Sequence, residues 1–154
     1  MKPYKIYLAG SMTGHRKEDV NGWRDELCSL LNSQIHAVSP FRDKEYLDDG
    51  RKIGHHSNVE NHPFDSIRGI NARDTFDLKT SDIVVACFLG TTERSLGTAA
   101  EIWGAGSVLN KPVIMIADKD NEHVKHPMLN DACAHIVGTV EEAAFIINSF
   151  FGVN

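Results

Sequence analysis

Apolar residues along the chain gather in short, continuous runs. The longest such run covers residues 83–89, and shorter ones cover 4–9, 35–38, 111–117 and 135–137. Short apolar runs without polar alternation are typical of strands that are buried on both faces of a parallel sheet. The pattern therefore predicts a sheet of about five strands, with the strand at 83–89 near its centre.

Between these runs, apolar side chains recur at the spacing of a helix that packs along one face. This spacing predicts helices over about 17–32, 65–81, from 95 onward, 127–133 and 140–151. Strands that alternate with helices favour a parallel sheet covered on both sides. We expect a Rossmann- or flavodoxin-like three-layer α/β sandwich that forms one domain over residues 1–154.

Residues 41–64 show little apolar periodicity and contain His55, His56 and His62. A long irregular segment in a compact domain is usually a lid or a loop with a function, and we expect a solvated loop here. The three histidines lack the helical spacing or the cysteine partners of zinc sites, so no metal site is expected. Residues 118–125 are polar and are also expected to form a loop.

Composition narrows the class of protein. The 154 residues carry a net charge of −5 without any basic run, which argues against nucleic-acid binding. Cys28, Cys87 and Cys133 are far apart, and the start of the chain lacks a signal-peptide pattern, so we expect a reducing, cytoplasmic setting. No apolar run approaches the length of a membrane span, so no membrane partner is expected.

The segment 95–101 carries the clearest candidate chemistry. A strand, a polar turn, a glycine and a helix follow one another here, which is how α/β proteins present backbone N–H groups to an anion. We interpret Ser95, Gly97 and Thr98 as ligand-binding residues and Glu101 as a carboxylate that acts on the ligand. The alternative is a capping box in which Thr98 caps the helix and Glu101 reaches back. The two alanines before Glu101 favour the first interpretation because they leave the carboxylate accessible.

A second loop with small polar residues, Gly10-Ser11-Met12-Thr13-Gly14, follows the first expected strand. Right-handed crossovers place the carboxyl ends of parallel strands at one edge, where open α/β sheets bind ligands. We therefore expect this loop and the segment 95–101 to share that edge. Taken alone, the loop is better interpreted as a plain strand-to-helix turn.

Together these segments resemble the nucleoside 2-deoxyribosyltransferase-like proteins, a family that includes nucleoside deoxyribosyltransferases and 2'-deoxynucleoside 5'-monophosphate N-glycosidases. The resemblance covers most of the chain. It is carried by Tyr7-Leu-Ala-Gly10-Ser11-Met-Thr-Gly14, Ser39-Pro40-Phe41-Arg42, Asp74 eight residues before Asp82, Ser95-Leu-Gly-Thr-Ala-Ala-Glu101 and His126-Pro127-Met128.

The resemblance implies a retaining mechanism in which Glu101 attacks the anomeric carbon and forms a glycosyl ester. It implies that Asp74 exchanges a proton with the base and that Tyr7 hydrogen-bonds Glu101. On the residues alone, Tyr7 reads as a core aromatic, Asp74 as an exposed helix acid and Arg42 as a solvated side chain. The resemblance further implies no cofactor, a homo-oligomer, and substrate contacts from Gly10, Ser11, Met12, Thr13, Gly14, Arg42, Ser95, Gly97 and Thr98, with His126 and Met128 reaching in from the neighbouring subunit.

The residue at position 95 bears on the substrate. In the family that this chain resembles, members that act on free nucleosides carry an acid at this position. Members that act on monophosphates resemble this sequence, in which Ser95 is followed by Leu96-Gly97. A hydroxyl and helix N-terminal amides bind phosphate, so we expect a nucleoside 5'-monophosphate. Thr13 stands where the monophosphate glycosidases carry an arginine, and Arg94, Arg16 or a neighbouring subunit's His126 is the expected replacement.

Three other functions stay open. One is a deoxyribosyltransferase for free nucleosides. Another is a phosphoribohydrolase of the lysine-decarboxylase-like kind, whose motif resembles Gly97-Thr-Ala-Ala-Glu101 but whose preceding Pro-Gly-Gly is missing. The third is a non-catalytic nucleotide-sensing module on the same fold. Hydrolysis and base transfer are both compatible with the site residues, and so are different bases.

Overall fold

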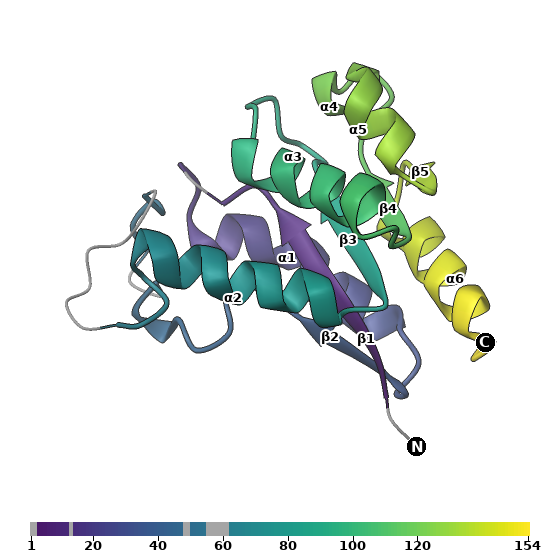
Figure 1. Ribbon diagram of the computed structural model, residues 1–154, viewed down its shortest axis with the longest axis horizontal. Helices are drawn as coiled ribbons and strands as arrows, with labels where there is room; N and C mark the ends of the chain where they lie inside the picture. The colour runs from purple at the N-terminus through teal and green to yellow at the C-terminus, as the bar shows by residue number, and fades with distance from the viewer. Residues whose placement is uncertain (1–2, 13, 48–49, 55–61) are drawn as a thin grey trace.

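A parallel sheet forms the centre of the molecule in the computed structural model, which describes residues 3–12, 14–47, 50–54 and 62–154. Its strands are β1 (Tyr4–Gly10), β2 (Ile35–Val38), β3 (Ile83–Cys87), β4 (Val113–Ile116) and β5 (His135–Val137). They pair in the order β2-β1-β3-β4-β5, so β3 is central (Figure 1). This order is that of the flavodoxin-like fold, and the predicted fold class is confirmed.

Helices cover both faces of the sheet (Figure 1). α1 (Lys17–Leu30) and α6 (Val140–Phe151) pack on one face, where Leu27 and Ile147 enter the core. α2 (Ile67–Thr80), α3 (Leu96–Trp103) and α5 (Pro127–Ala132) pack on the other. Shorter elements are the 3₁₀ turn η1 (Glu45–Leu47), the π-helical turn η2 (Gly104–Val108) and α4 (Glu122–Lys125). None of the helices in the described residues is long and apolar enough to cross a membrane.

Alternation along β1 decides which side chains reach the candidate site. Ile6 and Leu8 belong to the core beneath α1 and α6, whereas Tyr7 and Ala9 belong to the core beneath α2 and α3. Both sets are buried because helices cover both faces. The ring of Tyr7 therefore lies in the layer between the sheet and α3.

Local capping shifts two of the expected boundaries. The second long helix begins at Ile67 rather than near 65, because the side chain of Ser66 accepts a hydrogen bond from the Gly69 amide and caps it. The expected loop at 118–125 contains α4, whose N-cap is Asn121. Short polar helices of this kind have no apolar periodicity to reveal them.

The described part of 41–64 is not the solvated loop that the sequence suggested. Phe41 and Ile53 are buried with Val20 in a small cluster of their own, and Lys44 is buried as well. Two isolated apolar residues anchor this segment, and periodicity does not detect isolated anchors. His55 and His56 lie outside the described residues, and His62 contacts the carbonyl of Asp43 at 3.1 Å. No cluster of three metal-ligating side chains occurs among the residues that the structure describes.

The backbones of η2 and α5 approach each other closely at Gly106. A Cβ atom on Gly106 would lie 2.0 Å from the carbonyl oxygen of Ala132, whereas one on Gly104 would meet nothing within 4 Å. We expect Gly106→Ala to destabilise the protein by about 1–3 kcal/mol, because backbone has to move to admit the methyl group. Gly104→Ala, at a helical φ of −60°, is the matched control and should be neutral or stabilising. Urea denaturation measures both, and equal unfolding free energies would contradict the tight contact.

Candidate active site

A hydrogen bond between β1 and α3 forms the centre of the candidate site. The hydroxyl of Tyr7 donates to Oε1 of Glu101 at 2.9 Å. Tyr7 is fully buried, so its ring is held by the core and its hydroxyl has a fixed position. This bond orients the Glu101 carboxyl group and leaves its second oxygen, Oε2, without that constraint.

The capping-box alternative for Glu101 is wrong. The cap of α3 is Ser95, whose Oγ accepts a hydrogen bond from the Thr98 amide at 3.4 Å and donates to the Thr98 hydroxyl at 2.9 Å. Glu101 lies on the side of α3 that faces β1 and bonds to Tyr7 instead. The Glu101 carboxyl group therefore does not cap the helix.

Burial dominates the electrostatics of this carboxyl group. Burial, and after it the nearby charge of Asp74, raise the pKa of Glu101 from 4.5 to about 8, although the Tyr7 hydroxyl and the Arg24 guanidinium oppose the shift. Burial likewise raises the pKa of Asp74, which Lys44 opposes most strongly. Burial and mutual repulsion both disfavour the state in which the two carboxyl groups are ionised together.

Asp74 and Glu101 face the same cavity, of about 440 Å³, between α2, α3 and η2. Gly97 also lines this cavity, and the remaining wall is largely apolar, with Ile67, Ile70, Leu78, Val108 and Leu109. A mostly apolar hollow with a few polar groups at one end is the usual form of a small-molecule site. The structure thus brings three predicted site residues together around one cavity.

The first loop lies at the same edge of the sheet, beside the amino-terminal end of α1. Gly10 ends β1 opposite Cys87, Ser11 is buried, and Met12 packs against the cluster of Val20, Phe41 and Ile53. Gly14 has a φ of +85°, which favours glycine, and its amide donates to the Ile53 carbonyl at 2.7 Å. Thr13 lies outside the described residues.

Arg42 turns toward α2 rather than toward Glu101. Its Nη1 lies 2.6 Å from Oδ2 of the buried Asp77 and donates to the Ser39 carbonyl at 3.3 Å. It lines a different hollow, with Asp43, Phe64 and Arg73. Arg42 is therefore not among the residues that line the cavity beside Glu101, and its expected substrate contact stays a prediction.

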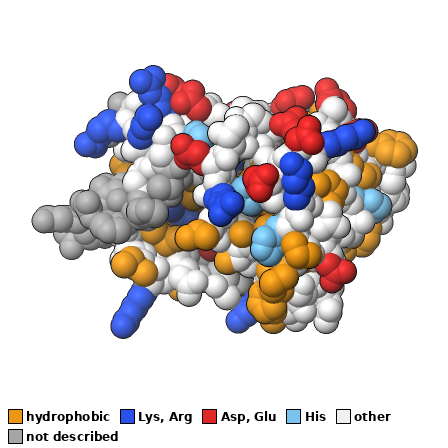
Figure 2. Space-filling view, turned by 90° about the horizontal axis from the view of Figure 1, so that it is seen from above, with side chains coloured by type: hydrophobic (Ala, Val, Ile, Leu, Met, Phe, Trp, Pro, Cys, Tyr) orange, Lys and Arg blue, Asp and Glu red, His pale blue; other side chains and the backbone are white. Residues whose placement is uncertain are grey.

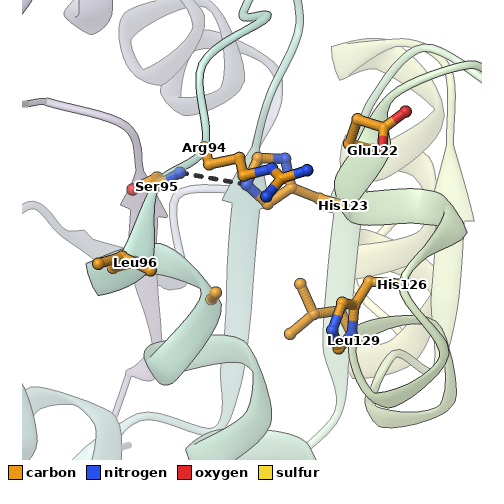
Figure 3. A pocket seen from close by; sticks show the side chains of 8 residues that line it. Arg94, Ser95, Leu96, Glu122, His123, His126 and Leu129 are labelled. Carbon is orange, nitrogen blue, oxygen red and sulfur yellow. Dashed lines mark hydrogen bonds between the residues drawn. The ribbon is translucent and has the colours of Figure 1, made fainter.

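Ser95 and His126 line a second cavity, of about 340 Å³, between the start of α3 and the α4–α5 segment (Figure 3). Arg94, Glu122, His123 and Leu129 contribute to it, and Figure 3 shows Arg94 and His123 beside Ser95. Thr98 is buried in α3, while Met128 is largely exposed. Within one chain, neither His126 nor Met128 is among the residues that line the cavity beside Glu101.

Sequence reasoning missed Arg24, a buried cation behind the site. Its guanidinium lies between the rings of Trp23 and Phe41, at 4.6 and 5.0 Å from their centroids, and donates to the carbonyls of Val20 and Leu8. None of the ion pairs among the described residues involves Arg24, and its Nε has no hydrogen-bond partner. The sequence could have indicated the burial of Arg24, because this residue lies at helical spacing from the apolar residues Val20 and Leu27.

Comparison with known proteins identifies the class to which this fold and site belong. A family model described as Nucleoside 2-deoxyribosyltransferase matches residues 6–148 of the chain. The chain therefore belongs to the nucleoside 2-deoxyribosyltransferase family, whose members are enzymes that act on small nucleoside substrates.

Solved structures share the fold at low sequence identity. A conserved protein from Enterococcus faecalis V583 superposes with a TM-score of 0.64 at 18% identity, covering 96% of this chain and 99% of that one. A 2-deoxyribosyltransferase from Bacillus psychrosaccharolyticus superposes with a TM-score of 0.61 at 19% identity, covering 91% and 90%. No curated protein sequence gives a match. At these identities the structural likeness establishes the fold.

The raised pKa of Glu101 makes stability depend on pH. The folded state binds this proton more tightly than the unfolded chain, so folding loses stability as the pH rises from about 4.5 to about 8. Glu101→Gln removes that loss, and we expect its unfolding free energy relative to the wild type to increase by more than about 1 kcal/mol between pH 4.5 and 8.

Urea denaturation across this pH range measures the difference. Glu26→Gln, an exposed carboxyl on α1, is the control and should track the wild type at every pH. A difference between Glu101→Gln and the wild type that stays constant with pH would contradict the buried, protonated carboxyl group.

Proposed function

We propose that the protein cleaves the N-glycosidic bond of a 2'-deoxynucleoside, preferably as its 5'-monophosphate, through a covalent glycosyl–Glu101 intermediate. The observation that carries this proposal is the hydrogen bond from Tyr7 to Glu101 beside a cavity that also holds Asp74. It supplies a positioned nucleophile and, across the same cavity, a second carboxyl group with a raised pKa. Retaining glycosidases use such a pair for the same bond chemistry.

In the first step the Glu101 carboxylate attacks the anomeric carbon while the bond from that carbon to the base nitrogen breaks. The electron pair of that bond leaves with the base, and Asp74 donates a proton to the base. With Tyr7 bonded to Oε1, Oε2 is the oxygen suited to the attack. The reactive form of the pair is the one with Glu101 ionised and the proton on Asp74, and this proton is transferred to the base.

In the second step, water or another base attacks the anomeric carbon of the ester and Asp74 accepts the proton of the attacking group. The bond to Oε2 breaks and Glu101 is restored as a carboxylate. Hydrolysis and transfer differ only in which acceptor reaches the intermediate. The apolar wall formed by α2 and η2 suits a flat base that stays in place, which favours transfer when a base is present.

The start of α3 supports binding of a 5'-phosphate. Ser95 brings a hydroxyl rather than a carboxylate to this position, and the amides of Leu96 and Gly97 are in the first turn, where helices leave N–H groups without an intrahelical acceptor. The helix dipole adds positive potential there. Arg94 lines the adjacent cavity and is the cation of the same chain nearest in sequence to Ser95.

Transfer between free nucleosides is the second candidate. Membership of the nucleoside 2-deoxyribosyltransferase family favours it, and so does the absence of an arginine from the first loop, where Thr13 stands. The two candidates share Glu101 and Asp74 and differ at the 5' end of the substrate, so one experiment separates them.

The test compares deoxynucleoside 5'-monophosphates with the matching nucleosides, with and without an acceptor base, by chromatography of the bases. We expect kcat/KM to be at least roughly tenfold higher for the monophosphates, which corresponds to about 1.4 kcal/mol of binding to the phosphate. Equal values would contradict phosphate recognition, and turnover of nucleosides alone would establish the second candidate.

Glu101→Gln tests the covalent step in the same assay. We expect base release to fall by roughly a thousandfold or more, since a nucleophile is lost, while calorimetry still detects substrate binding. Mass spectrometry of acid-quenched wild-type protein should detect the glycosyl adduct, and Glu26→Gln is the control. Unchanged turnover in Glu101→Gln would overturn the mechanism.

We also infer that the protein assembles with a second copy across the face formed by α2, α3 and η2. Large hydrophobic side chains are exposed on these elements and on α5, namely Ile67, Leu96, Trp103, Val108 and Met128. Ile67 and Val108 line the cavity beside Glu101, and Leu96 lines the cavity beside Ser95. Figure 2 looks onto the carboxyl edge of the sheet and shows hydrophobic side chains and histidines gathered along its lower side. A second copy on this face brings another His126 and Met128 to the site.

Ile67→Asp tests this assembly, because the side chain is 76% exposed and a charge disfavours an apolar interface. We expect the variant to sediment as a monomer in analytical ultracentrifugation and to lose activity, while the wild type sediments as a dimer or larger. Phe145→Asp, 69% exposed on α6 at the opposite face, is the matched control and should keep the assembly. A monomeric wild type would refute the inference.

A further inference from the structure

The side chains of Asn121 and His123, which lie between β4 and α5, hold the loop that leads into α3. Nδ2 of Asn121 donates to the Thr91 carbonyl at 3.0 Å, and Oδ1 of Asn121 accepts the His123 amide at 3.0 Å. The Ser95 amide donates to Nε2 of His123 at 3.2 Å, the bond drawn in Figure 3. The imidazole is buried and stacks on Phe88, with ring centroids 3.8 Å apart and planes 10° from parallel.

These contacts allow only one protonation state of His123. A backbone N–H can only donate, so Nε2 must carry a lone pair toward Ser95. Nδ1 lies 2.8 Å from Oδ1 of Asn121, whose Nδ2 is engaged by carbonyls, so Nδ1 carries the hydrogen. The ring is thus neutral, with its proton on Nδ1. A second proton would set two N–H groups against each other at Ser95.

The surroundings of the ring favour this neutral state. Burial lowers the pKa of His123, and the nearby charges of Arg94 and His126 lower it further, while Glu122 opposes them. These groups come from the loop before α3 and from the α4–α5 segment, the two parts packed around the ring. The acceptor at Nε2 is therefore present throughout the neutral pH range.

Ser95 links this contact to the proposed chemistry. It caps α3, the helix that carries Glu101, and its amide bond to His123 fixes the direction in which the helix begins. Since His123 takes the Ser95 amide, the first-turn amides that stay open to a ligand are those of Leu96 and Gly97. A rotation at Ser95 would move those donors relative to Glu101.

We propose that His123 is a positioning residue for the 5' end of the substrate, acting as a neutral acceptor that holds Ser95 and the first turn of α3. The proposal rests on the proposed function and deepens it. His123 touches Ser95 rather than the reacting atoms. Its loss should therefore affect the KM of a substrate with a 5'-phosphate far more than kcat.

Two variants separate the acceptor from the ring. His123→Phe keeps the stacking on Phe88 but removes the acceptor, and His123→Gln supplies an amide oxygen that accepts the Ser95 amide but cannot be protonated. We expect His123→Phe to raise the KM for the monophosphate by roughly five- to a hundredfold with kcat within about threefold of the wild type. His123→Gln should restore KM to within about threefold. His36→Phe, an exposed histidine on β2, is the control.

The pH dependence gives a readout that a purely structural histidine would not. In the wild type, KM for the monophosphate should rise in the acid range below the ordinary imidazole pKa, where His123 takes up a second proton, whereas in His123→Gln this rise should be absent. An identical acid limb in both proteins, or equal losses in kcat for the monophosphate and the nucleoside, would overturn the proposal.

A measurement without substrate keeps the two proposals distinguishable. The ¹⁵N shifts of the His123 ring report its tautomer, and hydrogen exchange reports the Ser95 amide. We expect an unprotonated Nε2 and a Ser95 amide that exchanges more than roughly tenfold faster in His123→Phe than in His123→Gln. If this pattern holds while no nucleotide is cleaved, the proposed function fails and the contact stands. A protonated Nε2, or equal exchange in the two variants, overturns the role of His123 whether or not the enzyme is active.

Discussion

The bond between Tyr7 and Glu101 ties the first strand of the sheet to the helix that follows the third. It places an ionisable carboxyl group where water has little access, which is unfavourable for its charged form. The phenol offsets part of that penalty through one short hydrogen bond, because its own pKa lies well above the ordinary value and it stays a donor. A fixed, poorly hydrated carboxylate is the form of this group best suited to bond with an electron-deficient carbon.

Two cations, Arg24 and Lys44, oppose the rise in the pKa values of Glu101 and Asp74. Arg24 approaches the carboxyl end of β1 from the α1 side and favours an ionised Glu101, and Lys44 favours an ionised Asp74. Gly10 leaves room for this, since a Cβ atom there would lie 3.0 Å from Nη2 of Arg24. Neither cation bonds directly to the carboxylates, so both tune the charge of the pair while its oxygens stay available to a ligand.

The apolar pattern predicted the strands and long helices because burial on both faces forces each strand to be apolar throughout. Glu101, Asp74 and Gly97 were found because motif spacing on a helix translates directly into position around one cavity. Tyr7 reads as a core aromatic from its residue type, and it is one, yet its hydroxyl also bonds Glu101. The direction in which Arg42 points could not be predicted, because the sequence does not reveal that Asp77 is buried and pairs with it.

His123 shows why loops resist such reading. It lies in a polar stretch without periodicity. Its role depends on contacts with Phe88 and Ser95, which are distant from it in sequence. These residues come close together only because the parallel strands align their carboxyl ends. The same alignment lets different elements each bring a group to this edge of the sheet. β1 brings the Tyr7 phenol, α2 and α3 bring the carboxyl groups of Asp74 and Glu101, and α4 brings the His123 imidazole. On the proposed function, different contacts position the two ends of the substrate: Tyr7 holds the Glu101 carboxyl group, whereas His123 holds Ser95 at the start of α3.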